Sequence, residues 1–415
     1  MMARRPWWAL RCGLAARIVG AAALLAPALA AAEEEPAEAH PIVDAICARG
    51  TRLEQVAEYE SAAELLEECA KLSGAEGPLA RAIVLRLGLD QRDVAFYSVA
   101  RYVRWFGKTN PAMASSVVLA LALSHEERED WARALQVMEE RRDLLRAAPM
   151  EVRVRAHVAK GLALLATRKG TEGLAELAAA RALYGDGEAI EKEIATSWPA
   201  AEPWQKDRRL GKVIQAYGVA LVTLADAERT TRLAGLAPPV YAGPRTEAAV
   251  LAFLAAKGPP WMVKRRAALA AAEGPYLAVL DIKPVPPPAA VIDAASAVAS
   301  MWADYADDIA RIVPRDGWPP SAGATAGRPP PAVVRGVAEL RDSVTAQHVL
   351  PAMKKCLDLS VKYQFTDARS RACEAWLTKN DPDHYHAGSE LSPGVRVPGR
   401  AWVNAAPQRA RPPSP

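Results

Sequence analysis

Apolar residues recur every three or four positions along most of this chain, the spacing of one face of an α-helix. The clearest copy begins at Tyr59, with small Ala62 three positions later, large Leu66 four further on and small Cys69 after another three. A small residue at such a position lets a second helix approach closely, while the larger ones fill the groove beside it. The pattern therefore predicts helices that pack in pairs.

This helix-pair pattern recurs and resembles the second helix of a tetratricopeptide repeat. The small residues of successive copies are Ala62, Ser98, Ala134 and Ala175, at spacings of 36, 36 and 41 residues. Prolines at 78, 111 and 149 follow polar or glycine breaks, as expected for the first turn of a helix. Four candidate hairpins between residues 42 and 185 are enough for a solenoid, which needs at least about three repeats.

The pattern becomes irregular after residue 200. Helices are predicted at 203–234, 245–257, 259–281, 289–312, 332–363 and 367–379, with proline-rich breaks at 283–288 and 314–331. We find no convincing period-two strand pattern. The predicted fold class is all-α: a tetratricopeptide-like helical-hairpin solenoid followed by an irregular helical C-terminal region.

The predicted organisation follows from these breaks and from composition. It comprises a signal peptide (1–32), a linker (33–41), tetratricopeptide-like repeats (42–200), a helical region (201–313), a Pro/Gly-rich loop (314–331), a C-terminal helical hairpin (332–390) and a disordered, basic, Pro-rich tail (391–415).

The beginning of the chain has the pattern of a secretory signal. Arg4 and Arg5 precede a small-residue apolar stretch from Gly13 to Ala32, which contains a cleavage-type Ala-Leu-Ala sequence at 28–30. The alternative is a transmembrane anchor, which Arg17 disfavours because it interrupts the apolar run. We therefore predict an exported protein of the periplasm or cell envelope, with no transmembrane anchor after the signal is removed.

The charge balance argues against a nucleic-acid partner. The chain has 52 basic and 48 acidic residues, and residues 1–32 contain four arginines and no acid. The mature chain then has 48 of each and no large basic field.

The four cysteines of the mature chain form two symmetric pairs. Cys47 and Cys69 are centred on a predicted turn at residue 58, and Cys356 and Cys373 on a helix break between 364 and 365. Residues equidistant from the turn of an antiparallel helix pair lie opposite each other, so both pairs are disulfide candidates. The alternatives are four buried thiols or a zinc site, although no pair has the short Cys-x-x-Cys spacing.

The sequence shows little that would support catalysis. Phosphate-loop, nucleophile-turn and His-Glu-x-x-His motifs are absent, and no cofactor is predicted. Two clusters are interpreted as solvated surface: Asp304, Asp307 and Asp308, and Asp381, Asp383, His384 and His386. Most tryptophans are read as packing anchors. The candidates for contact with a partner protein are four aromatic residues of the repeats: Tyr59, Tyr102, Trp105 and Trp131.

Residues 205–393 resemble the exported tetratricopeptide envelope proteins of myxobacteria, of the type associated with gliding motility. The segments that carry this resemblance are Pro239–Pro244, Met301–Tyr305, Cys356–Phe365, Ser370–Leu377 and Tyr385-His386. The chain departs from the family after His386, where Ala-Gly-Ser replaces an acidic residue, and in its basic tail. The resemblance implies a helical-repeat protein of an envelope assembly, without catalytic residues.

Three functions remain open from the sequence. The first is a non-catalytic scaffold that binds an envelope protein or peptide through residues 42–185. The second is a cell-wall-acting enzyme whose repeats position its substrate, and the third is a structural spacer. The oligomeric state does not follow from the sequence.

Overall fold

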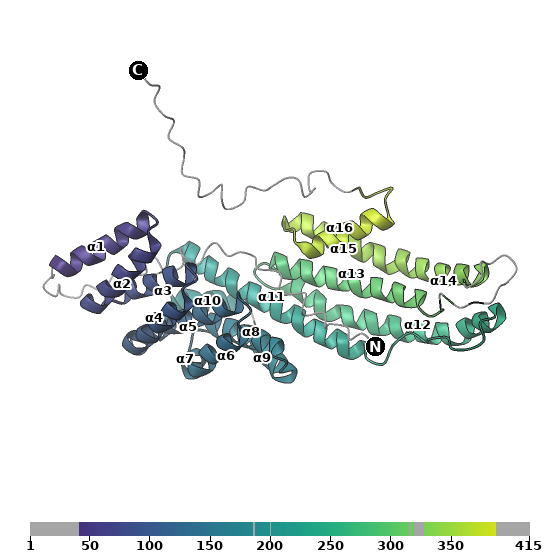
Figure 1. Cartoon of the computed structure of the whole chain (residues 1–415), viewed down its shortest axis with the longest axis horizontal. Helices are drawn as coiled ribbons and strands as arrows, with labels where there is room; N and C mark the ends of the chain where they lie inside the picture. The colour runs from purple at the N-terminus through teal and green to yellow at the C-terminus, as the bar shows by residue number, and fades with distance from the viewer. Residues whose placement is uncertain are drawn as a thin grey trace, which may run out of the picture. The chain divides into compact units, whose positions relative to one another are not determined.

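A computed structural model describes residues 41–185, 187–199, 201–314, 316, 318 and 328–386. The predicted signal peptide and C-terminal tail lie outside the described residues, as do nearly all of the linker and most of the 314–331 loop. The described residues are helical and contain no strand (Figure 1). Successive helices pack as adjacent pairs, which confirms the all-α helical-hairpin fold.

The chain divides into two compact units. Among the described residues, the first comprises those from 41 to 234 and from 270 to 291, and the second those from 235 to 269 and from 292 to 386. The first unit contains these helices: α1 (Pro41–Gln55), α2 (Tyr59–Ser73), α3 (Glu76–Gly88), α4 (Arg92–Phe106), α5 (Pro111–Glu126), α6 (Trp131–Glu140), α7 (Arg142–Arg146), α8 (Met150–Ala166), α9 (Gly170–Tyr184), α10 (Gly187–Ser197) and α11 (Pro203–Leu233). Two helices contribute to both units, α12 (Glu247–Leu277) and α13 (Pro288–Ala310), and a 3₁₀ turn, Ala278–Asp281, follows α12. The second unit also contains α14 (Pro331–Val344), a π-helical turn (Thr345–Val349), α15 (Leu350–Tyr363) and α16 (Ala368–Asn380).

The repeats share one turn geometry. Each hairpin of α1–α2, α3–α4, α5–α6 and α8–α9 has a single left-handed residue between its helices, with φ of 64°, 66°, 62° and 65° at Ala57, Asp90, Glu129 and Arg168. The next amide donates to the carbonyl five residues earlier, as from Gln91 N to Arg86 O at 2.9 Å. This is the hydrogen bonding of a Schellman-type helix end. Repeat lengths measured between these residues are 33, 39 and 39.

The hairpin α15–α16 has the same turn. Gln364 is left-handed, with φ of 50°, and Phe365 N donates to Ser360 O at 3.1 Å. The C-terminal hairpin is therefore built like one of the repeats, although its sequence pattern does not reveal this.

The turns also correct the repeat register. The residue five positions after each left-handed residue is Ala62, Ala95, Ala134 or Gly173, and all four are buried. The predicted Ser98 is buried but belongs to a polar contact, because its Oγ donates to Glu67 at 2.7 Å. The predicted Ala175 is exposed. Because the repeats differ in length, the equivalent position is Ala95, three residues before the predicted Ser98, and Gly173, two residues before the predicted Ala175.

The closest approach within a repeat is between α8 and α9. A Cβ on Gly173 would lie 2.8 Å from the carbonyl oxygen of Gly161, and a Cβ on Gly161 would lie 2.8 Å from Leu177. Both glycines are therefore required by contact between the helices rather than by their backbone angles.

We expect Gly173→Ala to lower the free energy of unfolding by about 1–3 kcal/mol, because the new methyl group meets a backbone oxygen that cannot move independently. Gly170→Ala is the matched control in the same helix, where a Cβ meets nothing within 4 Å. Urea denaturation of both variants measures the difference. Equal stabilities would contradict the close approach of α8 and α9.

Helix α11 follows the repeats and packs against α8, α9 and α10. By length and composition alone, α11 is also a candidate membrane span. Its apolar positions have partners within the first unit: Val213 is fully buried, and a Cβ on Gly218 would lie 2.7 Å from Ala290 and Pro287. The absence of a membrane anchor in the mature chain stays a prediction.

Helix α12 is continuous where two helices were predicted. It passes through Gly258-Pro259-Pro260 without ending. The two prolines remove two amide donors from the helix, while Trp261 and Met262 directly after them are buried and Trp261 Nε1 donates to Leu236 O at 3.1 Å. Tertiary contacts of the following turn thus offset the local cost of the prolines.

Candidate functional site

The four aromatic candidates all lie on second helices of repeats. Tyr59 and Trp105 are exposed, with 42% and 40% of their surface accessible, and Trp131 is half-buried. The prediction for Tyr102 is wrong, because this side chain is fully buried and its hydroxyl donates to the Glu76 carboxylate. Burial and this hydrogen bond raise the pKa of Tyr102 above its ordinary value. Tyr102 is therefore a core residue that a partner does not reach.

Helix α4 presents a ridge of exposed aromatic and aliphatic side chains with one half-buried arginine among them. The ridge consists of Val94, Tyr97, Arg101 and Trp105, which are spaced three to four residues apart and share one helix face. Tyr97 is 69% exposed, more than Trp105 or Tyr59. The Arg101 guanidinium lies over the Trp105 ring, 5.5 Å from its centroid. We call these four residues the α4 ridge.

The aromatic rings of the ridge are held by neighbours. Tyr97 meets Phe96 edge to face, with centroids 5.8 Å apart. Trp105 meets Phe106 in the same way at 6.2 Å, and Arg133 of α6 lies 5.6 Å from the Phe96 centroid. Rings that are already oriented lose less conformational entropy when a partner packs on them.

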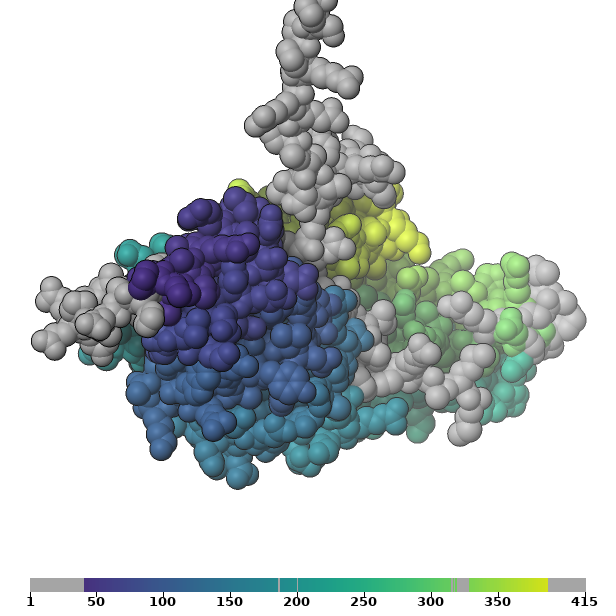
Figure 2. Space-filling model, turned by 60° about the vertical axis from the view of Figure 1, so that its left-hand side comes forward, coloured from purple at the N-terminus to yellow at the C-terminus, as the bar shows by residue number. Residues whose placement is uncertain are grey.

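An open hollow of about 490 Å³ borders the ridge at Val94. Its other lining residues are polar: Glu60, Glu64, Arg86, Asp90, Gln91, Arg92 and Asp93. Hydrogen bonds fix part of this lining, from Arg86 to Gln91 at 2.6 Å and from Gln91 to Glu60 at 2.7 Å. The repeats, coloured purple to blue in Figure 2, present a continuous surface. Aromatic and arginine side chains beside a polar rim are the composition of many protein interfaces.

Sequence reasoning missed Tyr97 although a signal was present. Tyr97 precedes Trp105 by eight residues, which places both on one helix face. The signal becomes useful only once the bounds of α4 and its buried side are known.

Both predicted disulfides are present. Cys47–Cys69 joins α1 to α2 and Cys356–Cys373 joins α15 to α16, with Cα atoms 5.1 and 6.4 Å apart. The four cysteines among the described residues are thereby all paired, so the free-thiol and zinc interpretations are wrong for them. Two disulfides are typical of an exported protein in an oxidising compartment.

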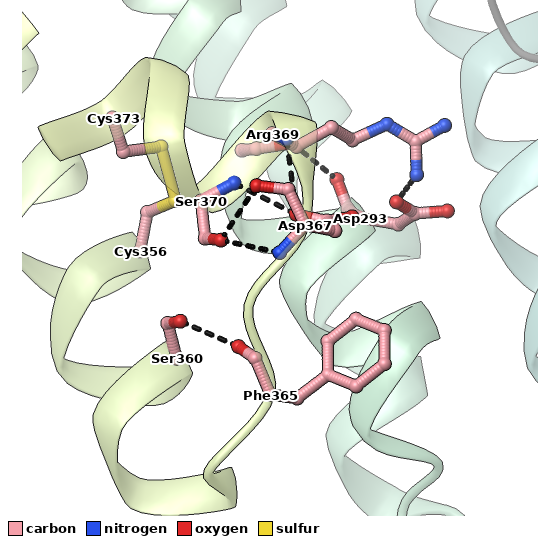
Figure 3. The surroundings of a disulfide bond; sticks show 9 residues. Asp293, Cys356, Ser360, Phe365, Asp367, Arg369, Ser370 and Cys373 are labelled. Carbon is pink, nitrogen blue, oxygen red and sulfur yellow. Dashed lines mark hydrogen bonds and ion pairs between the residues drawn. A yellow bond between two sulfur atoms is a disulfide. The ribbon is translucent and has the colours of Figure 1, made fainter. Parts of the chain in front are cut away.

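The second disulfide closes a hairpin with a well-defined helix start (Figure 3). Asp367 Oδ1 accepts from the amides of Arg369 and Ser370 at 3.0 and 2.8 Å, and Ser370 Oγ accepts from Asp367 N at 2.9 Å. This reciprocal pair is a capping box. Arg369 also forms an ion pair with Asp293 of α13, which attaches the hairpin to that helix.

The acidic and histidine clusters form ion pairs. Asp308 lies 3.2 Å from Arg265 and 3.0 Å from Arg311, and Asp307 lies 3.7 Å from Arg341. In the other cluster, Asp381 lies 2.6 Å from His384 and 3.5 Å from Lys354. These contacts give the carboxylates of Asp307, Asp308 and Asp381 structural partners.

Comparisons with known proteins assign no family. A scan against protein-family models finds no match, and a search of curated proteins finds no similar sequence.

Proposed function

We propose that this protein is a non-catalytic scaffold of the bacterial periplasm or cell envelope, and that its repeats bind a partner protein through the α4 ridge. The observation that carries the proposal is the ridge itself: Tyr97 and Trp105 are exposed and oriented on a helical-repeat surface, with Arg101 between them. Tyrosine, tryptophan and arginine are the residues most enriched at interface hot spots.

Two further observations support the location. The disulfides fit an oxidising compartment, and the N-terminal sequence has the pattern of a secretory signal. The resemblance of residues 205–393 to myxobacterial envelope proteins favours an envelope assembly, of which gliding motility is one example.

The test is a quantitative pull-down from envelope extract with the mature protein and a Tyr97→Ala/Trp105→Ala variant. Loss of one hot-spot residue costs about 2 kcal/mol, or about thirtyfold in affinity. We therefore expect the double variant to lose the partner by at least about tenfold. Trp204→Ala is the matched control, because Trp204 is a 49% exposed aromatic residue on α11.

Crosslinking mass spectrometry of the same samples locates the contact. Crosslinks from residues 92–108 to one envelope protein are expected. Equal recovery of the partner by the double variant and the control would contradict a role for the ridge, and recovery of no partner at all would favour the spacer.

A further inference from the structure

A cluster of positive charges surrounds one buried carboxylate between α8 and α11. Glu151 of α8 is fully buried, and its Oε1 lies 2.8 Å from Arg209 Nη1 of α11. Arg209 stacks on the Trp198 ring at 3.4 Å from its centroid. Arg155 lies one turn after Glu151, with its Nη1 3.6 Å from Glu151 Oε2. The single carboxylate is thus shared by two arginines.

Lys212 adds a further positive charge at the same place. It follows Arg208 and Arg209 by four and three residues, so its side chain shares their face of α11. Burial and, after it, the charges of Arg155, Arg208 and Arg209 together lower the pKa of Lys212 to about 7, against the opposing effect of Glu151. Arg155, Arg209 and Lys212 are therefore three cationic groups around one acid, Glu151.

Two of these cations have unused hydrogen-bond donors. Within the part of the chain that the structure describes, Lys212 makes no hydrogen bond or ion pair. Arg155 has only its ion pair with Glu151, at a distance too long for a hydrogen bond, and its side chain is 15% exposed. Like charges gathered away from water are costly without a compensating anion.

We propose that Arg155, Arg209 and Lys212 form a binding site for a phosphate group between α8 and α11. A phosphate dianion compensates more of the excess charge than a carboxylate does. Its oxygens also accept from the fork of a guanidinium and from an ammonium together. Bound phosphate stabilises the charged form of Lys212, so binding takes up a proton near neutral pH. The site is independent of the α4 ridge.

The test measures thermal unfolding of the full chain at pH 7 in inorganic phosphate, with acetate and chloride at equal ionic strength. We expect a saturable rise in melting temperature in phosphate that acetate does not reproduce. Lys212→Met is expected to melt no lower than the wild type in chloride, because it removes a half-buried like charge, and to lose at least about tenfold in phosphate affinity. Lys192→Met, an exposed lysine of α10, is the control and keeps the phosphate response.

Two further experiments identify the source of the phosphate group and provide a second variant in case Lys212→Met does not fold. In one outcome the protein cosediments with phosphatidic acid vesicles, Lys212→Met abolishes this binding, and inorganic phosphate has no effect on the melting temperature. That outcome would assign the site to a phosphomonoester headgroup of a lipid. Arg155→Gln gives a second variant that should lose the response. Three results would overturn the proposal. They are a rise in melting temperature in acetate equal to that in phosphate, a phosphate response that is unchanged in both variants, and no response to either inorganic phosphate or the vesicles.

Discussion

Replacing Glu151 with glutamine is expected to lower the free energy of unfolding by about 3–5 kcal/mol, the cost of removing one partner from a buried ion pair. The carboxylate is fully buried and accepts from Arg209 at 2.8 Å. Without it, Arg155, Arg209 and Lys212 would remain close together with no negative charge among them. Glutamine keeps the shape of the side chain, so the loss reports charge rather than packing.

Urea denaturation at pH 7 measures this effect, with Glu191→Gln as the control. Glu191 is an exposed residue of α10, and its replacement should change stability by no more than about 0.5 kcal/mol. Combining Glu151→Gln with Lys212→Met should recover part of the loss, because the second change removes one of the repelling charges. Strict additivity of the two changes would show that Lys212 does not interact with this cluster.

Removing the Cys356–Cys373 disulfide as Cys356→Ala/Cys373→Ala is expected to lower stability by about 3 kcal/mol, the usual value for a closed loop of this length. The two cysteines are 17 residues apart. The bridge restricts the unfolded chain, and in the folded state it holds α15 to α16. Alanine is chosen because both cysteines are buried and a serine hydroxyl would lack a partner.

Hydrogen exchange should place this loss in residues 350–380. Besides the disulfide, the ion pair between Arg369 and Asp293 holds the hairpin to α13. The π-helical turn that precedes the hairpin is held to α13 by the stacking of His348 on Trp302, whose ring centroids are 4.0 Å apart. The Cys47→Ala/Cys69→Ala variant is the comparison, and it should leave protection of 350–380 unchanged. Four titratable thiols in the denatured, unreduced mature protein would contradict both bridges.

The cysteine pairing could be predicted because it depends on local geometry. Cys47 and Cys69, like Cys356 and Cys373, are nearly symmetric about a helix turn. An antiparallel hairpin brings such positions together whatever packs around it.

The repeat register could not be predicted as well. The turn residues Ala57, Asp90, Glu129 and Arg168 are left-handed without being glycine. Left-handed backbone is normally marked by glycine. The sequence therefore did not mark the turn at Asp90, and the pattern predicted Ser98 at the position that Ala95 occupies.

The candidate site was predicted in part. Trp105 and Tyr59 are exposed as the scaffold hypothesis requires, whereas Tyr102 is buried and Tyr97 was missed. Tyr97 and Tyr102 are aromatic residues of the same helix, so composition does not separate them. The packing of α3 and α5 against α4 decides which one faces solvent.

The sequence by itself determined the helical class, the hairpin pairing and the two disulfides, because these depend on periodicity and on neighbours within about twenty residues along the chain. The tertiary structure alone decided which side of α4 is exposed and that α12 continues through two prolines. It also brought Glu151 and Lys212, 61 positions apart, into one cluster. Such contacts depend on how whole helices pack, and the pattern within one helix does not specify its partner.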